Sequence, residues 1–314
     1  MPRPVRFRVV EPEDGTLLPI VLARRLPDLD LAAAKELVRS GAVYLGHLRV
    51  RLPTTRVVTG ERITVYPAAL DKTELPLQTV RFVHRDPSFV VLDKPAGVPV
   101  AQTRDSSRGT LAEALRRVLV DEGVVRPYVG VVHRLDQGAS GLVLFTIRSV
   151  VNKSMHRLFA EHRIERRYRL RVVGEPPEHM RCEAALVELQ HGRVRVANDG
   201  EPRARAAATE MRRMVPEHPL VDGQAAALME ATLETGRTHQ IRVHAQTLGY
   251  PVLGDRKYGD RDDDEPARLY LHADRLCFSH PSTGEPIDLR APRPQWARAT
   301  TDDQTDAPDE PVSS

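Results

Sequence analysis

The hydrophobic pattern of residues 142–173 constrains the fold of this chain most strongly. The apolar run LVLF at 142–145 has the length of a buried strand. Apolar residues then recur at helical spacing, which predicts a helix over about 149–162: Val151, Met155, Leu158 and Phe159. A strand of alternating pattern follows at 168–173, and another apolar run, FVVLDK, stands at 89–94. The chain therefore mixes strands with amphipathic helices.

The alternation at 167–172 separates two faces of one strand. Tyr168, Leu170 and Val172 share one face, and Arg167, Arg169 and Arg171 share the other. We expect Tyr168 to point into the core or a cleft and the arginines to face solvent or RNA. An ordinary core tyrosine with a satisfied hydroxyl fits the pattern of Tyr168 equally well.

Length and composition limit the class of protein. At 314 residues the chain can hold one large domain and a small one. No apolar run reaches the roughly 20 residues needed to span a bilayer, and the first residues lack the apolar segment of a signal peptide. Cys182 and Cys277 have neither disulfide nor metal-ligand spacing. We expect a cytoplasmic protein in which both thiols are buried and inert.

The formal net charge of +3 is unevenly distributed. Residues 300–314 carry five acids and no base, so the remainder of the chain is more basic. Arginine outnumbers lysine, and its planar guanidinium suits bidentate contacts to phosphate. A basic body fits a polyanionic partner, but GC-rich codons also enrich arginine, so charge alone decides little.

The first 67 residues form a pattern of their own, with a core expected at 15–67. Two short helices are predicted at 17–26 and 30–41, with Asp30 as N-cap and Gly41 at the end of the second. Residues 42–50 alternate around Gly46 as a hairpin, and 61–67 form a strand. This order resembles the RNA-binding module of ribosomal protein S-four, although Leu31–Ala34 departs from its usual polar pattern. The resemblance implies RNA contacts by Lys35, Arg39, His47, Arg49 and Arg51; a small packing domain with a solvated basic edge is the alternative.

The rest of the chain divides into three parts. Residues 68–79 have mixed charge and a proline, as in a linker. Residues 80–298 form the large domain, within which 260–268 is expected to be an exposed acidic loop. Residues 299–314 cannot bury enough apolar area to order, so a disordered acidic tail is predicted.

HRLDQGASG at 133–141 is the strongest candidate for chemistry. It lies between two apolar segments, where turns commonly present catalytic side chains. Gly138 and Gly141 let the backbone turn tightly around Asp136. A surface turn with an ion pair between Arg134 and Asp136 is the plain alternative.

Two further motifs accompany it. In DKPAGVPV at 93–100, Lys94 could reach phosphate, although a purely structural turn is as plausible. In TGRTHQIRVH at 235–244, Thr238 is the expected N-cap of a helix, and Arg242 lies at the margin of its apolar stripe, where it can meet a carboxylate. His239 and His244 are five residues apart, which does not place them on one helical face, so no metal site is predicted.

In this order the motifs resemble the RluA family of RNA pseudouridine synthases. The matching stretches span about 80–292: KPAG at 94–97, HRLD at 133–136, SGL at 140–142, Tyr168, GRTHQIRVH at 236–244, GD..YG at 254–259 and LHA…F.HP at 271–281. The resemblance implies an α+β fold with a mixed, mainly antiparallel central sheet flanked by helices. It also implies an isomerase that needs no cofactor or metal.

The resemblance assigns roles to four residues. Asp136 matches the essential aspartate, and Arg134 matches the arginine that helps displace the target base. Tyr168 matches the tyrosine that packs on the base, and Arg242 matches the basic residue that pairs with the aspartate. The target uridine must leave its stack for this chemistry. We expect further RNA contacts from Lys94, Arg167, Arg169, Arg237 and His239.

Two departures from the family pattern and two alternatives accompany this assignment. Ala139 replaces a threonine, which should tune activity rather than abolish it, and Arg166 replaces a lysine with its charge kept. A catalytically inactive RNA-binding or ribosome-assembly factor is the main alternative. A hydrolase with His133 or Asp136 as base is another, although no nucleophile motif is present. The expected partner is structured RNA, ribosomal RNA before transfer RNA, bound by a monomer.

Overall fold

The computed structural model describes residues 4–66, 74–101, 109–189, 192–215, 220–221, 224–259 and 268–299. The chain divides into two compact units. The first contains Met1–Thr79 and Pro99–Val125, and the second contains Val80–Val98 and Arg126–Ser314. Residues 260–267 of the expected acidic loop at 260–268, residues 300–314 of the expected tail at 299–314, and residues 68–73 of the expected linker lie outside the described residues.

A four-stranded antiparallel sheet and two helices build the core of the first unit. Strands β1 (Val5–Arg8), β4 (Arg62–Val65), β2 (Val43–Leu45) and β3 (Leu48–Val50) lie in that order. Helices α1 (Leu18–Arg25) and α2 (Leu31–Arg39) contact each other and share a buried apolar cluster with the sheet. The Asp30 side chain accepts a hydrogen bond from the Ala33 amide, so the predicted N-cap is confirmed. The unit also contains the short helices η1 (Glu11–Glu13) and η3 (Leu77–Thr79) and helix α3 (Leu111–Asp121).

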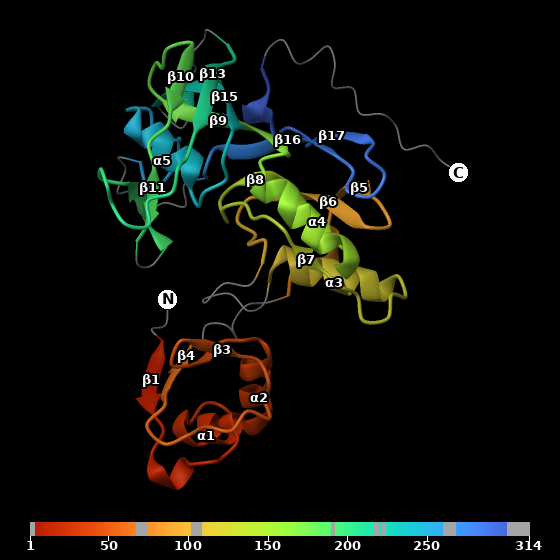
Figure 1. Cartoon of the computed structure of the whole chain (residues 1–314), viewed down its shortest axis with the longest axis vertical. Helices are drawn as coiled ribbons and strands as arrows, with labels where there is room; N and C mark the ends of the chain where they lie inside the picture. Colours follow the sequence, from red (N-terminus) through yellow and green to blue (C-terminus); the bar gives the residue numbers. More distant parts are fainter. Residues whose placement is uncertain are drawn as a thin grey trace. The chain divides into compact units, whose positions relative to one another are not determined.

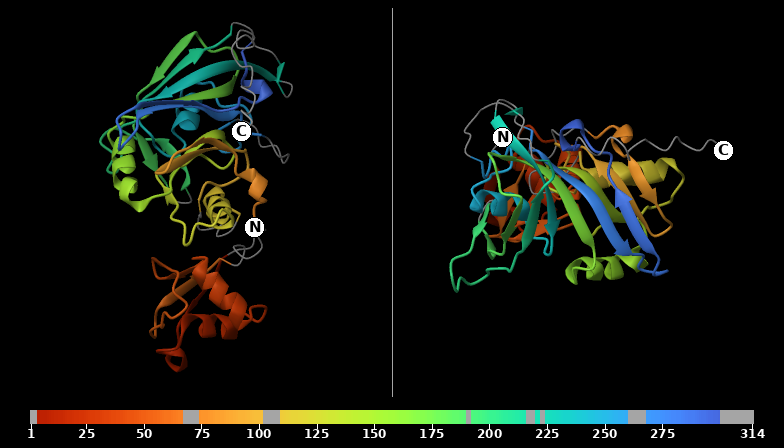
Figure 2. Two further views of the ribbon diagram at one scale, coloured as in Figure 1. Left: turned by 90° about the vertical axis from the view of Figure 1, so that its right-hand side faces the viewer. Right: turned by 90° about the horizontal axis from the view of Figure 1, so that it is seen from above.

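An 11-stranded sheet dominates the second unit (Figure 1). Its main path runs β10 (His179–Cys182), β13 (Thr209–Arg213), β15 (Gln224–Leu233), β9 (Glu165–Val173), β16 (Leu271–Ser279), β8 (Ser140–Thr146), β6 (Phe89–Lys94) and β5 (Phe82–Arg85). Strands β14 (Leu220–Val221), β17 (Pro286–Arg290) and β7 (Gly130–Val131) pair at its margins. Figure 2 shows its long strands side by side.

Almost every strand pair of this sheet is antiparallel, while β8 and β16 are parallel. Helix α4 (Ser149–Ala160) packs against β8 and buries Met155 and Leu158 in the apolar cluster beneath it. Helix α5 (Gln240–Thr247) packs against β13 and the β-hairpin of β11 (Leu186–Glu188) and β12 (Val194–Val196). The short helix η5 (Gln295–Ala297) follows β17. The predicted α+β class with a mainly antiparallel sheet is confirmed, as are the strand at 89–94 and the helix that begins near residue 149.

The arginine face of β9 does not lie open to solvent. Arg169 is 4% exposed and Arg171 is 7% exposed. Strand β9 lies between β15 and β16, so both of its edges are paired and it is an interior strand of the sheet. Arg169 lies 3.8 Å from Asp274 and 3.9 Å from Glu230, and the Arg171 guanidinium donates to the carbonyls of Trp296 and Ala226. The expectation that these two arginines face solvent or RNA was wrong.

Helix α5 begins later than predicted. Its N-cap is His239, whose φ of 53° places it in the left-handed region, so Thr238 is not the cap. The Thr238 hydroxyl instead donates to Glu188. The first turn is closed by the Gln240 side chain, whose Oε1 accepts from the Arg237 amide at 3.0 Å and from the Thr235 hydroxyl at 2.7 Å.

The two cysteines differ in their surroundings. Cys182 is buried, as expected, whereas Cys277 is partly exposed. Burial and a hydrogen bond from its Sγ to Asp288 raise the pKa of the Cys277 thiol to about 11, which keeps it protonated. In the described part of the chain, no helix has the length and apolar character to cross a membrane.

Candidate active site

A cavity of about 830 Å³ opens in the second unit beside the HRLD turn. The turn between β7 and β8 supplies Arg134 and Asp136, and β9 supplies Tyr168. Helix α4 supplies Phe159, and the loop between β15 and α5 supplies Arg237 and His239. Residues far apart in the sequence thus line one hollow. Its volume is ample for a nucleotide-sized ligand.

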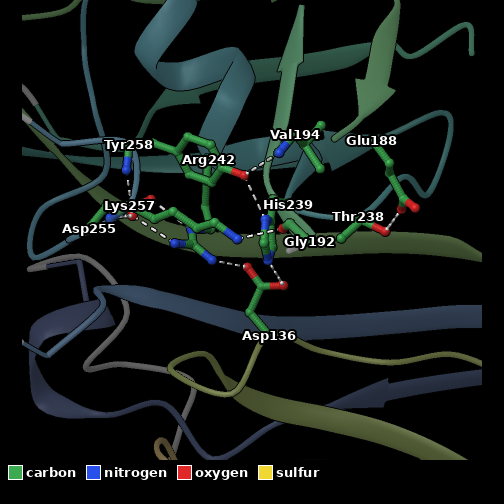
Figure 3. Close-up of polar contacts among 10 residues, drawn as sticks. All are labelled: Asp136, Glu188, Gly192, Val194, Thr238, His239, Arg242, Asp255, Lys257 and Tyr258. Atoms are coloured by element: carbon green, nitrogen blue, oxygen red, sulfur yellow. Dashed lines mark hydrogen bonds and ion pairs between the residues drawn. The ribbon is translucent and has the colours of Figure 1, made fainter. Parts of the chain in front are cut away.

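Asp136 ion-pairs with Arg242 on the wall of this cavity. Arg242 Nη1 donates to Asp136 Oδ2 at 2.7 Å (Figure 3). His239 Nε2 lies 3.7 Å from the other carboxylate oxygen. The Asp136 side chain is 19% exposed, so the carboxylate is fixed and still open to a ligand. The contact expected between Arg242 and Asp136 is present.

Asp255 holds Arg242 from the opposite side. Its two oxygens accept from Arg242 Nε and Nη2, each at 2.7 Å, in a bidentate pair with a fully buried carboxylate. Burial tends to lower the pKa of Arg242, but its hydrogen bonds to Asp255 and Asp136 raise it above the ordinary arginine value. Arg242 therefore stays charged.

Sequence reasoning gave Asp255 no role. Its side chain also accepts from the Lys257 and Tyr258 amides at 2.9 and 3.1 Å, so its position is set by its own turn. The sequence does contain a signal for Asp255. It lies in the GD..YG motif at 254–259, which matches the family pattern but was not assigned a function.

A hydrogen-bonded chain leads from β12 to Asp136 through Tyr258 and His239 (Figure 3). The Val194 amide donates to the Tyr258 hydroxyl at 3.0 Å, and that hydroxyl lies 2.7 Å from His239 Nδ1. Burial lowers the pKa of His239, although the nearby Asp136 opposes this shift, so the ring is neutral near pH 7. With Tyr258 donating to Nδ1, the ring proton sits on Nε2, which faces Asp136.

Tyr168 lies beside Asp136 in the cavity wall and is 8% exposed. Burial raises the pKa of its hydroxyl, Asp136 raises it further, and Arg166 opposes the shift. The phenol is therefore protonated near neutral pH. Its ring, the apolar side chains of Leu135 and Leu233, and Phe159 give the cavity an apolar wall that suits a flat base.

Two further arginines that the sequence analysis named, Arg134 and Arg237, also line this cavity. Arg134 is exposed and lines the cavity beside Asp136. Arg237 lines the same cavity and donates from Nε to the Ala206 carbonyl at 3.0 Å. The structure thus places six of the named residues in one site: Arg134, Asp136, Tyr168, Arg237, His239 and Arg242.

Lys94 is not available to phosphate. It is fully buried at the end of β6, where Nζ donates to the carbonyls of Pro95, Val98 and Gln137 at 2.9, 2.8 and 3.1 Å. The Gln137 amide group returns a bond to the Gly97 carbonyl at 2.9 Å. The KPAG turn therefore braces the residue next to Asp136, and the expectation of a phosphate contact from Lys94 was wrong.

The remaining named residues are not among those that line the cavity. Arg167 is 34% exposed and ion-pairs with Glu165 at 2.5 Å, and Arg169 is buried in the sheet. The other five residues belong to the first unit. Four of them are exposed: Lys35, Arg39, His47 and Arg51. The fifth, Arg49, donates to the Gly41 carbonyl.

His133 is poorly suited to act as a base. Its Nε2 accepts from the Leu144 amide at 2.9 Å, and its ring stacks on Phe159 at 4.6 Å between centroids. Burial lowers the pKa of His133 to about 3, and Arg166 adds to the shift. The ring nitrogen that could take a proton is thus already occupied by the backbone.

A family model and the similar proteins compared with this chain all belong to the RNA pseudouridine synthases. A model of the RNA pseudouridylate synthase family matches residues 88–247. The chain is 32% identical to ribosomal large subunit pseudouridine synthase D of Zymomonas mobilis over 90% of this chain and 91% of that protein. It is 30% identical to ribosomal large subunit pseudouridine synthase C of Pasteurella multocida over 90% and 89%.

Among solved structures, human RNA pseudouridylate synthase domain containing 1 matches with a TM-score of 0.58 and 25% sequence identity, over 71% of this chain and 87% of that one. The family match spans the HRLD turn, β9 and the GRTHQIRVH segment, which are the parts that build the cavity. The chain therefore belongs to the RluA-type family of RNA pseudouridine synthases, which are isomerases.

Proposed function

We propose that this enzyme isomerises uridine in structured ribosomal RNA and that Asp136 is its catalytic carboxylate. The observation that carries the proposal is the 2.7 Å pair between Asp136 and Arg242 at the wall of an 830 Å³ cavity. The carboxylate is held on one side by a permanently charged guanidinium and is open to the cavity on the other.

The reaction breaks the bond between N1 of uracil and C1′ of ribose, turns the base, and joins C5 to C1′. The proton on C5 is released to solvent. An ionised carboxylate beside the ribose can begin this sequence by attack at C1′ or by removal of the 2′ proton. In either route Arg242 keeps the carboxylate in place, and the neutral Tyr168 ring packs on the base while it turns.

The target base must leave its stack to enter the cavity. Extrusion leaves a gap in the RNA that a side chain can fill. Arg134 is exposed and lines the cavity, and it is the residue we assign to that task. Arg237 and His239 lie on the loop between β15 and α5 and line the same cavity, where they can contact the extruded nucleotide.

Ribosomal RNA is proposed as substrate because the compared bacterial relatives are named for the large ribosomal subunit. Transfer RNA is the second candidate. We further propose that the first unit is an RNA-binding module like that of ribosomal protein S-four, with the exposed Lys35 and Arg39 of α2 among its contacts. The expected setting is the cytoplasm, where ribosomal RNA is assembled, and the expected state is a monomer.

Tritium release tests the proposal. Ribosomal RNA labelled with tritium at C5 of uracil is incubated with the wild type, with Asp136→Asn, and with the control Asp199→Asn, an exposed aspartate outside the cavity. We expect release by the wild type and by Asp199→Asn and none by Asp136→Asn, with RNA binding retained in all three. Release by Asp136→Asn at the wild-type rate would refute the role of Asp136. Release by none of them, on ribosomal and transfer RNA alike, would favour a non-catalytic RNA-binding factor.

A further inference from the structure

The charge inside the cavity is one-sided. Among the described residues that line it, Asp136 is the carboxylate, whereas four are arginines: Arg134, Arg166, Arg205 and Arg237. Asp136 is already paired with Arg242. The cavity therefore holds several positive charges that its own walls do not neutralise, which favours an anionic ligand.

Arg166 is the most unusual of these arginines. It is 7% exposed, and its Nε is buried without a hydrogen-bond partner. Its guanidinium lies 5.9 Å from the centre of the Phe159 ring, and no ion pair to it exists among the described residues. A buried and unpaired guanidinium is costly unless a ligand completes it. In the wall of a cavity, that ligand can come from the cavity side.

Arg166 reaches Arg237 across Gly236. A Cβ atom on Gly236 would lie 2.3 Å from Arg166 Nη1, so the absence of a side chain there admits the guanidinium. Burial lowers the pKa of Arg237, and the charges of Arg205 and Arg166 lower it further. The three arginines are therefore close enough to repel one another, which a shared anion would relieve.

The same wall continues into a second hollow of about 350 Å³. Arg205, Gly236 and Arg237 line both, so the two hollows adjoin. Several other arginines of this unit have carboxylate partners. Arg195 pairs with Glu201 at 2.8 Å, and Arg293 pairs with Asp274 at 2.7 Å. Among the described residues, no carboxylate pairs with Arg166, Arg205 or Arg237 in this wall.

We propose that Arg166, Arg205 and Arg237 form a phosphate seat that binds the phosphodiester adjoining the extruded uridine. This inference rests on the proposed function and names a subsite of it. Guanidinium groups match phosphate oxygens in bidentate geometry, and RNA supplies one such charge for each nucleotide. With the phosphate seated here, the ribose is held beside Asp136 while the base turns. The second hollow receives the next nucleotide along the strand.

Small ligands test the seat without catalysis. Dissociation constants of uridine, uridine 5′-monophosphate and uridine 3′-monophosphate are measured by NMR titration against the wild type, Arg205→Gln, and the control Arg157→Gln. Arg157 is an exposed arginine of α4, 3.8 Å from Glu161 and outside the cavity lining. We expect at least one monophosphate to bind about tenfold more tightly than uridine, because a charge-assisted contact is worth about that much. The preference should fall in Arg205→Gln and persist in Arg157→Gln.

Salt dependence on RNA gives the second measurement. The slope of log(kcat/KM) against log[KCl] for tritium release should be smaller in Arg205→Gln, by up to about 0.7, because the seat loses one of the three charges that neutralise its phosphate. The slope of Arg157→Gln should equal that of the wild type. The seat is overturned if neither monophosphate is preferred over uridine, or if the slope of Arg205→Gln equals that of the wild type. Failure of the wild type to release tritium would overturn the proposed function instead, and the nucleotide titration would still decide the seat.

Discussion

At the scale of single residues, the position of Asp136 depends on side chains that do not line the cavity, among them Asp255 and Tyr258. Asp255 is fully buried and fixes the guanidinium of Arg242 through two bonds, so that Nη1 is left for Asp136. Tyr258 orients His239 in the same manner from the other side. The carboxylate therefore has its partners arranged in the absence of RNA, as the catalytic role proposed for it requires.

Replacement of Asp255 should show this dependence. In Asp255→Asn the buried charge of Arg242 loses its fully buried partner, so the free energy of unfolding should fall by about 3–5 kcal/mol. The value of kcat should fall by about 100-fold, with KM less affected. The reason is that the Arg242 guanidinium shifts from its position and no longer holds Asp136 in place. Urea unfolding and tritium release measure both. Asp288→Asn breaks a surface pair with Arg275 and should cost less than about 1 kcal/mol; equal losses in the two variants would contradict the argument.

The partly buried His133 predicts a pH dependence of stability. Its pKa is lowered from 6.5 to about 3 in the folded protein, so the unfolded chain takes up a proton at His133 below about pH 6.5 while the folded protein does not. The stability contributed by the neutral ring is therefore present above pH 6.5 and is lost as the pH falls toward 3. The loss amounts to about 1.4 kcal/mol per pH unit.

Urea unfolding at pH 7, 6 and 5 checks this expectation. The free energy of unfolding of His133→Gln should fall less per pH unit than that of the wild type. The difference should be at most the roughly 1.4 kcal/mol per pH unit that uptake of one proton contributes. A residual slope is expected from His272, whose pKa burial lowers to about 4. The same slope in His133→Gln and in the wild type would show that His133 titrates normally in the folded protein.

At the scale of elements, hydrophobic periodicity located the strands and helices but not their surroundings. The run FVVLDK became β6 with the expected bounds, and the i, i+4 spacing of Val151 and Met155 became α4. Alternation in β9 was taken to mean a solvent face, yet Asp274 and Glu230 on neighbouring strands cover its arginines. Periodicity describes one strand, whereas burial depends on strands that are distant in sequence.

The beginning of α5 has a different explanation. Thr238 is a good N-cap type, but the backbone enters the left-handed region at His239, and the Gln240 side chain satisfies the Arg237 amide in place of a capping hydroxyl. That turn aims His239 at Asp136. Local preference was overridden where the site required a particular side-chain direction.

The KPAG turn offers a test at this scale. Lys94→Met would remove three hydrogen bonds to carbonyls, one of them on Gln137, the neighbour of Asp136. We expect a loss of about 1–3 kcal/mol in stability and a lower kcat, with an unchanged salt slope of kcat/KM. A salt slope of kcat/KM reduced by about 0.7 in Lys94→Met would instead indicate that Lys94 contacts a phosphate of the RNA. Lys153→Met, on the exposed side of α4, is the control and should change neither quantity.

At the scale of the whole molecule, the candidate active site is confined to one of the two units. Every residue of the candidate active site lies in the second unit, and so do the arginines of the phosphate seat. The first unit has its own sheet and its own buried apolar cluster. A unit with an independent core and an exposed basic helix can add affinity for RNA without touching the reacting atoms.

Removal of charge from α2 should therefore affect binding and spare chemistry. Lys35 and Arg39 are exposed, and the ion pair of Arg39 with Glu36 is long, at 3.9 Å, so Lys35→Gln/Arg39→Gln should unfold at the wild-type temperature. We expect KM for the ribosomal RNA transcript to rise about tenfold at unchanged kcat. The salt slope of kcat/KM should fall by about 0.9 for each duplex phosphate that the variant no longer neutralises. Arg24→Gln, an exposed arginine of α1, controls for net charge. If both variants raise KM equally, the first unit attracts RNA only through its overall charge, and α2 is not the surface that recognises it.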